Sequence, residues 1–136
     1  MAIQQISNTT WTSSTVNNQT VYTSAESQTI GSSDSLVSGD ITQNVSAKKF
    51  IVDFEITTAY NDVAAKLEVE GSLDGTNWGV VDSLDSDTDP HNTGRTVYIA
   101  DLTSYTSIPL LRIHFNSGGL GVGTSGKCKF RYAFTS

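Results

Sequence analysis

The chain has 136 residues, a formal net charge of -6, one cysteine, and about a quarter of its residues are Ser or Thr. This length suits a single domain with one hydrophobic core. The acidic balance disfavours a nucleic-acid partner, because neutralising phosphates requires a basic surface, and a single cysteine excludes an internal disulfide. The chain also lacks a run of about 18 apolar residues, so we expect neither nucleic acid nor a membrane among its partners.

The first 47 residues contain no Lys or Arg and only scattered apolar side chains in a background of Ser, Thr, Asn and Gln. Two interpretations are open for this segment: short edge strands of a sandwich, or an extended arm that orders on a partner surface. We expect a mixture, in which residues 1–15 form an N-terminal arm and residues 16–136 form a single β-sandwich domain. Within that domain, strands are predicted near Val21 and from Leu36 to Val45.

From residue 48 onward, apolar and polar side chains alternate with the period of two that a half-buried strand requires. The alternating runs predict strands at 48–58, 64–72, 78–84, 95–102, 108–115 and 127–134. Asp74-Gly75 predicts a hairpin turn, because both residue types tolerate positive φ angles. About eight short strands without a helical period predict an all-β fold, an antiparallel β-sandwich that is jelly-roll-like.

The inward-facing positions of these strands supply the predicted core, and Trp78 is expected to cover one end of it. The predicted core comprises Phe50, Val52, Phe54, Ile56, Leu67, Val69, Trp78, Ile113, Phe115, Phe130, Tyr132 and Phe134. Cys128 is expected inside as a small buried hydrophobe. A catalytic thiol would need a histidine partner, and neither histidine carries a local signature that ties it to Cys128.

The strongest local motif is the turn Ser72-Leu-Asp-Gly-Thr-Asn-Trp78. Its structural interpretation is a tight turn with a packing tryptophan, and its functional interpretation is an exposed indole that stacks on a sugar or a protein partner. This S-x-D-G-x-N-W turn, followed by the strand Leu111–Phe115, resembles the β-sandwich module shared by discoidin-type carbohydrate-binding domains and by many small virion proteins of tailed bacteriophages. The resemblance covers residues 48–136.

The resemblance implies a virion structural protein: a capsid decoration, or cement, protein that binds the assembled phage head surface as a homotrimer and stabilises it. The chain shows no signal peptide and no cysteine pair of the discoidin type, which favours the phage branch and a protein made in the host cytoplasm and located in the virion. Its partner would be the major capsid protein or another virion protein. Two alternatives stay open: a carbohydrate-binding module that uses Trp78 or Trp11, and a tail or head-completion component.

The last predicted strand alternates basic and apolar side chains, so one of its faces is basic. This basic row has three interpretations: a solvent-facing side, protection of an edge strand against aggregation, or a contact with an acidic surface of a neighbouring subunit. The candidate partner-binding residues are Lys127, Lys129 and Arg131 in this row, Trp11 in the arm, and Leu120 and Val122 in the glycine-rich connector 116–126.

Asp85, Asp87 and Asp89 stand at alternate positions in a predicted acidic loop, 85–94, and form a candidate calcium site, because Ca²⁺ prefers oxygen ligands. Pro90 occupies the position where a calcium loop usually has glycine, so a solvated acidic loop is the competing interpretation. The chain offers neither a nucleophile elbow nor histidines with metal-ligand spacing. We therefore expect no catalytic residues, no cofactor and no enzyme activity.

Overall fold

The computed structural model describes residues 3–6, 11–27, 35–44, 46–59, 65–87, 93–105, 107–116 and 126–135. In these ranges the chain forms eleven strands and one 3₁₀ turn, η2 (Thr103–Tyr105). The strands are β1 (Ile3–Gln5), β2 (Thr12–Val16), β3 (Gln19–Thr23), β4 (Ser35–Val37), β5 (Ile41–Thr42), β6 (Lys49–Thr58), β7 (Ala65–Ser72), β8 (Gly79–Asp87), β9 (Gly94–Asp101), β10 (Leu110–Asn116) and β11 (Lys127–Thr135). Within the same ranges, no helix has the length and apolar character needed to cross a membrane.

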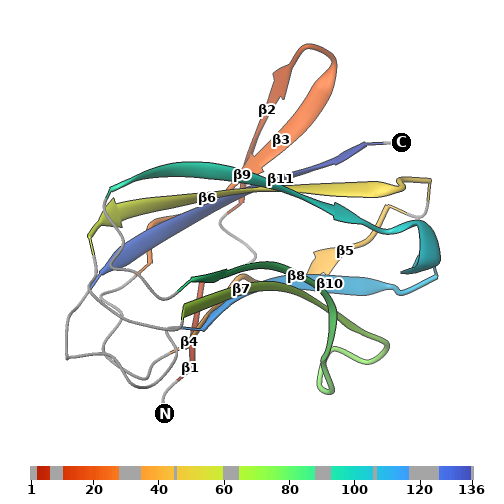
Figure 1. The fold of residues 1–136 in the computed structure, drawn as a ribbon. Coiled ribbons are helices and arrows are strands. Elements are labelled where there is room, and N and C mark those ends of the chain that lie inside the picture. Colours follow the sequence, from red (N-terminus) through yellow and green to blue (C-terminus); the bar gives the residue numbers. More distant parts are fainter. Residues whose placement is uncertain are drawn as a thin grey trace.

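The strands form two sheets stacked face to face (Figure 1). Sheet A has the order β1-β4-β10-β7-β8, with β5 also paired to β10, and sheet B has the order β2-β3-β11-β6-β9. The connections from β5 to β6, β6 to β7, β8 to β9, β9 to β10 and β10 to β11 all cross between the sheets, as in a jelly-roll-like sandwich. The predicted all-β sandwich is confirmed, with one parallel pair, β1 and β4, among otherwise antiparallel ones.

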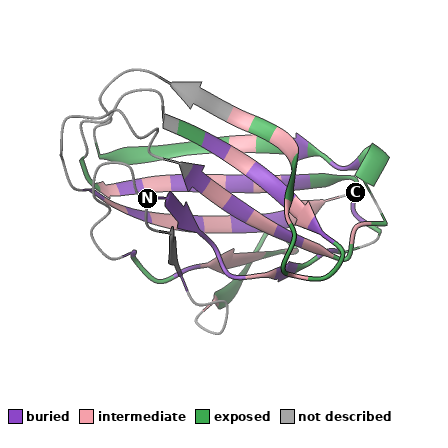
Figure 2. Ribbon diagram, turned by 90° about the horizontal axis from the view of Figure 1, so that it is seen from below, coloured by how far each residue is buried: buried purple, intermediate pink, exposed green. Residues whose placement is uncertain are grey.

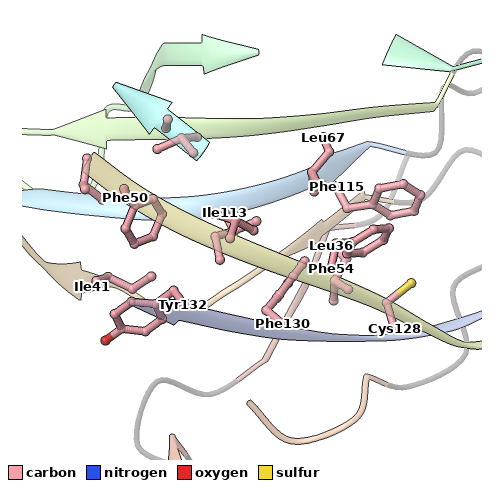
Figure 3. Close-up of a cluster of buried hydrophobic side chains, with 14 of the residues drawn as sticks. Leu36, Ile41, Phe50, Phe54, Leu67, Ile113, Phe115, Cys128, Phe130 and Tyr132 are labelled. Atoms are coloured by element: carbon pink, nitrogen blue, oxygen red, sulfur yellow. The ribbon is translucent and has the colours of Figure 1, made fainter. Parts of the chain in front are cut away.

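The core lies between the two sheets, where the apolar faces of the strands meet. Along β6 the burial alternates, and Phe50, Val52, Phe54 and Ile56 are all buried. Figure 2 shows the same alternation of buried and partly buried residues along other strands. In the cluster drawn in Figure 3, the Phe54 ring stacks on Phe130, with a centroid distance of 5.7 Å. The sequence period of two therefore predicted the core face of this strand correctly.

Cys128 is fully buried in this cluster, as expected. Burial, with a smaller contribution from the charge of Glu26, raises the pKa of its thiol to about 12. The thiol therefore stays protonated at neutral pH, which suits a packing residue and not a nucleophile.

Two predicted core residues lie outside the fully buried set. Phe134 is half-buried and packs against the rim of the core. Trp78 is also half-buried and is no part of the core cluster. It directly follows the β7–β8 turn, and Arg112 covers its ring at a distance of 4.4 Å from guanidinium carbon to ring centroid. The prediction that Trp78 covers the core is wrong.

The described residues of the predicted N-terminal arm pair with the rest of the fold. β1 pairs with β4, Ile6 is buried in the core, and β2 pairs along its length with β3. The chain folds back here because Asn17 and Asn18 adopt φ angles of 48° and 64°, as a type I′ hairpin turn requires. The expected boundary at residue 15 thus falls inside β2, although the β2–β3 hairpin projects beyond the sandwich (Figure 1).

β11 lies inside sheet B, between β3 and β6. Beyond the end of β3, two buried serines continue its pairing: Ser24 Oγ accepts from Phe130 N and Ser27 Oγ accepts from Cys128 N, both at 2.9 Å. These hydroxyls replace a neighbouring strand and satisfy buried backbone groups. The interpretation of the basic row as protection of an edge strand is therefore wrong.

In the described ranges the structure has three more strands than the predicted eight: β1 and most of β2 lie in the predicted arm, and the predicted strand from Leu36 to Val45 divides into β4 and β5. β1, β4 and β5 are only two or three residues long. Strands this short show too few residues for an alternating pattern. At the other extreme, β8 continues through Asp87. The predicted loop 85–94 therefore begins as a strand.

Candidate functional site

A groove of about 700 Å³ lies between the β2–β3 hairpin, the end of β11 and the chain around β5. The type I′ turn carries two asparagines to its rim, β11 supplies aromatic rings, and β5 supplies the opposite wall. Its lining residues are Asn17, Asn18, Gln19, Thr20, Tyr22, Thr42, Asn44, Tyr132, Phe134 and Thr135. All of these side chains are uncharged, so the described part of the groove offers rings, amides and hydroxyls without a fixed charge.

Stacked aromatic rings form one wall of this groove. Tyr22 and Tyr132 stand opposite each other in the β3–β11 register, and their rings stack with a centroid distance of 4.8 Å and an interplanar angle of 15°. Trp11 and Phe134 both meet the Tyr132 ring edge-on, at centroid distances of 4.8 and 5.8 Å. Burial and the neighbouring Tyr22 raise the pKa of Tyr132 to about 12. Tyr132 therefore stays neutral across the physiological range.

Two of the four described amide side chains that line the groove, Gln19 and Asn44, bond to the backbone. Gln19 Nε2 donates to the carbonyl oxygen of Phe134 at 3.5 Å, and Asn44 Oδ1 accepts from Ser46 N at 3.0 Å. An amide side chain both donates and accepts hydrogen bonds, and a hydroxyl does the same. The groove thus combines flat apolar rings with groups that match a ligand rich in hydroxyls.

A second polar cluster lies on the outer face of sheet A, where Glu70 of β7 is paired in register with Arg112 of β10. Arg112 Nε donates to Glu70 Oε1 at 2.7 Å, and His114 Nδ1 lies 3.3 Å from the same oxygen. Burial would raise the pKa of Glu70, but the His114 and Arg112 side chains outweigh burial and lower it. The charges of Glu70 and Arg112 therefore largely compensate each other within the sheet.

Trp78, the predicted sugar-stacking residue, belongs to this cluster, because one face of its ring lies against Arg112. Its Nε1 donates to the carbonyl oxygen of Gly75 at 3.3 Å. The rest of the S-x-D-G-x-N-W motif builds the turn: Ser72 Oγ accepts from Gly75 N, and Asp74 Oδ1 accepts from Thr76 N. The structural interpretation accounts for each of these bonds, and glycan stacking at Trp78 stays a prediction.

Replacing Glu70 with glutamine is expected to lower the free energy of unfolding at pH 7 by about 2 kcal/mol, because the substitution removes a charged partner of Arg112 from a buried position. The lowered pKa of Glu70 means that its contribution is present above its usual pKa and is lost as the pH falls through the lower, folded value. Urea denaturation at pH 7 and pH 3 should show the difference between the two proteins shrinking in acid. Glu68→Gln, on the same strand, is the matched control and should have little effect at pH 7.

The predicted partner-binding row on β11 is partly neutralised within the chain. Arg131 Nη1 bonds Glu55 Oε1 at 2.6 Å, and Lys127 Nζ lies 4.0 Å from Glu26 Oε1. Lys129 is paired in register with Glu55. The row therefore presents less net charge than its sequence suggests, and its contact with a partner stays a prediction.

The remaining predicted site residues are scattered. Trp11 is half-buried with its ring edge-on to Tyr132, but it is not among the residues that line the groove. Asp85 and Asp87 lie on β8, while Asp89, Leu120 and Val122 are outside the described residues. Over the described ranges, no three His, Cys, Asp or Glu side chains gather closely enough to hold a metal ion.

The sequence interpretation missed the groove, although a signal for its rim was present. Asn17-Asn18 stands between two five-residue runs rich in Thr and Val, and paired residues that tolerate positive φ between strands predict a type I′ hairpin. The opposite wall gave no signal. Thr42 and Asn44 approach Tyr132 only through the pairing of β5 with β10.

No family model matches the chain, and a search of curated proteins finds no match. Several solved structures are similar at low identity. A carbohydrate-binding module specific for non-crystalline cellulose has 10% identity, with 93% of this chain and 80% of that chain covered and a TM-score of 0.47. The family 11 carbohydrate-binding module from Clostridium thermocellum, in complex with a β-1,3-1,4-mixed-linked tetrasaccharide, has 12% identity, coverages of 93% and 89%, and a TM-score of 0.46.

The Yersinia pseudotuberculosis-derived mitogen is similar to the same degree, with 15% identity, coverages of 89% and 88%, and a TM-score of 0.46. These similarities assign no role to any residue of this chain. The function has to be argued from the groove itself.

Proposed function

We propose that the protein is a carbohydrate-binding domain that holds a neutral oligosaccharide in the groove between the β2–β3 hairpin and β5. The observation that carries the proposal is the composition of the lining. Over the described residues, the Tyr22, Tyr132 and Phe134 rings stand among amides and hydroxyls without a charged side chain. The volume of about 700 Å³ lies within the range of small-molecule sites.

The chemistry of a sugar matches this lining. A sugar ring presents an apolar C–H face that packs on an aromatic ring, and its hydroxyls both donate and accept hydrogen bonds. Because its described lining side chains are uncharged, the groove cannot compensate the negative charge of a phosphate or a carboxylate. A neutral oligosaccharide therefore fits better than a charged ligand. The proposed role is binding, and the expected lack of enzyme activity stays a prediction.

A variant that fills the groove tests the proposal. Thr42 is exposed and lines the groove, so Thr42→Trp should block ligand entry with little effect on folding. The matched control is Thr76→Trp, at an exposed position in the β7–β8 turn outside the groove. A panel of neutral and sialylated oligosaccharides is first screened on the wild type, and the best ligand is then titrated into each variant by calorimetry.

Binding of a neutral oligosaccharide that Thr42→Trp abolishes and Thr76→Trp preserves would support the groove. Two results would contradict the proposal: no binding across the panel, or equal binding by both variants.

Capsid decoration is a second proposed function, favoured by the shape of the β2–β3 hairpin. All five residues of β2 are exposed and the hairpin projects from the sandwich (Figure 1), which gives an arm suited to a neighbouring subunit in a lattice. Under this proposal the protein is located in a virion and binds the major capsid protein as a trimer. Purified phage heads would then bind the wild type, and Ser14→Glu, which places a charge on the exposed strand β2, would weaken binding without removing a core residue. A wild type that does not bind would exclude this role.

A further inference from the structure

Sheet B ends at β9, an unusually open strand edge. Among the described strands, β9 pairs with β6 alone, and this pairing runs from Gly94 to Asp101 without a shift of register. Val97 and Ile99 are each 60% exposed on the outer face. Natural edge strands are usually shortened, bulged or protected by Lys or Pro, because an open edge pairs with other chains. β9 contains neither Lys nor Pro.

The other described edges are blunted. At the edges of sheet A, β1 is three residues long, and the pairing of β8 with β7 has two register shifts. At the far edge of sheet B, β2 has five residues, of which only Val16 is apolar. β9 is therefore the long, regular and apolar edge of the sandwich.

The backbone of β9 determines which residues can pair outward. Leu102, directly after β9, donates its N–H to Lys48 O at 2.6 Å, so its backbone faces the β6 side. In an antiparallel pair, residues alternate between bonding toward one neighbour and toward the other. Ala100, Tyr98 and Thr96 therefore bond toward β6. The backbone groups of Asp101, Ile99, Val97 and Arg95 point away from it.

The sequence of this edge is complementary to itself. When two copies of β9 run antiparallel with Tyr98 opposite Tyr98, Val97 of each copy stands opposite Ile99 of the other, and Arg95 stands opposite Asp101. Each apolar and each charged match occurs twice, and all of these side chains lie on the outer face. Sliding the register by two residues to place Val97 opposite itself removes both Arg–Asp matches. Such cross-strand pairs are what stabilise a sheet.

The charged pair is also available to a second copy. Arg95 uses Nε and Nη2 to bind Asp53 of its own chain, and its side chain is 53% exposed. Asp101 accepts two bonds from Thr103 at Oδ1. Over the described ranges, the bonds to Asp53 and from Thr103 leave Arg95 Nη1 and Asp101 Oδ2 unused, so these two atoms can face the second copy.

We propose that the protein forms a two-fold dimer in which β9 pairs antiparallel with β9 of a second copy, centred on Tyr98, so that two five-stranded sheets become one. The inference is independent of the proposed carbohydrate binding. Closed two-fold pairing also uses up the open edge, which otherwise leads to open-ended association.

Mixing two single-cysteine variants tests the register directly. In the proposed dimer, Val97→Cys and Ile99→Cys stand opposite each other only between unlike variants, at the Cα separation of about 5.5 Å of a hydrogen-bonded pair, which a disulfide spans. Oxidation of the mixture should give a disulfide-linked dimer, and either variant alone should give none. The native Cys128 is fully buried and does not interfere. Circular dichroism checks that both variants are folded.

Light scattering tests the dimer without cysteines. The wild type should have the mass of two chains, and Ile99→Lys should have the mass of one at the same concentration, because two like charges would then lie within the new sheet. Val16→Lys, at a 54% exposed apolar position on the opposite edge strand, is the matched control and should stay dimeric. A monomeric or trimeric wild type, no cross-link in the mixture, or a cross-link in one variant alone would overturn the proposal.

Discussion

Replacing Tyr22 with alanine is expected to weaken oligosaccharide binding by at least about tenfold, equivalent to about 1.4 kcal/mol. Tyr22 lines the groove and its ring lies parallel to Tyr132. Its removal takes away the half-buried partner of the stacked pair and lets water reach the Tyr132 ring. Calorimetric titration of the wild type and the variant with the same neutral oligosaccharide measures the loss.

Two further variants separate ring stacking from general damage. Tyr22→Phe keeps the ring and should retain most of the affinity, since only a hydroxyl is lost. Tyr105→Ala removes a 38% exposed tyrosine from η2, outside the groove, and should bind like the wild type. If Tyr22→Ala also binds like the wild type, the aromatic wall is not the binding surface.

Replacing Phe130 with alanine is expected to lower the free energy of unfolding by about 4 kcal/mol. Phe130 is fully buried on the central strand of sheet B and stacks on Phe54. Truncation removes its apolar contacts and leaves a cavity between the two sheets. β11 is paired with a strand on each side, so the sheet cannot easily close over this cavity. Urea denaturation should show a lower midpoint with an unchanged slope.

The size of this loss is specific to the core position. Phe134→Ala, four residues further along the same strand face, removes the same atoms from a half-buried site at the rim. Phe134→Ala should lower the free energy of unfolding clearly less than Phe130→Ala, because the rim is open to water. Equal losses at both positions would mean that the two sheets do not enclose Phe130 as described.

The core of the fold could be predicted where strands are long and one-sided. β6 and β11 alternate over nine or ten residues, so their period of two shows directly which side chains face inward. The N-terminal half gave a weaker signal. Leu36 and Ile41 are fully buried, but each lies on a strand of two or three residues, and the buried hydroxyls of Ser24, Ser27 and Ser38 resemble loop residues in the sequence.

The groove could not be predicted from the sequence, because it arises from tertiary arrangement. Tyr22 and Tyr132 are separated by more than a hundred residues, and only the β3–β11 register brings their rings together. Trp78 was predicted to stack on a sugar because it is a tryptophan that follows a turn, but its environment depends on Arg112 from β10. A residue type suggests a chemistry, whereas its partners determine whether that chemistry is available.

The two proposals together give a bivalent protein. In the joined sheet the strand order runs outward from the β9 pair through β6, β11 and β3, so the two hairpins and their grooves lie at opposite ends. A dimer of this kind would bind a surface carrying many oligosaccharides more tightly than a free one, because the second contact becomes intramolecular. Ile99→Lys should lose this gain on a glycan-coated surface and keep the affinity for a free oligosaccharide.

The most direct test of the groove is an NMR titration of the isotope-labelled protein with the best neutral oligosaccharide. Binding in the groove predicts that the largest backbone amide shifts occur in residues 17–22, 42–44 and 132–135, with little change around Glu70 and Arg112. Shifts centred instead on Trp78 and the outer face of sheet A would contradict the groove as the binding site.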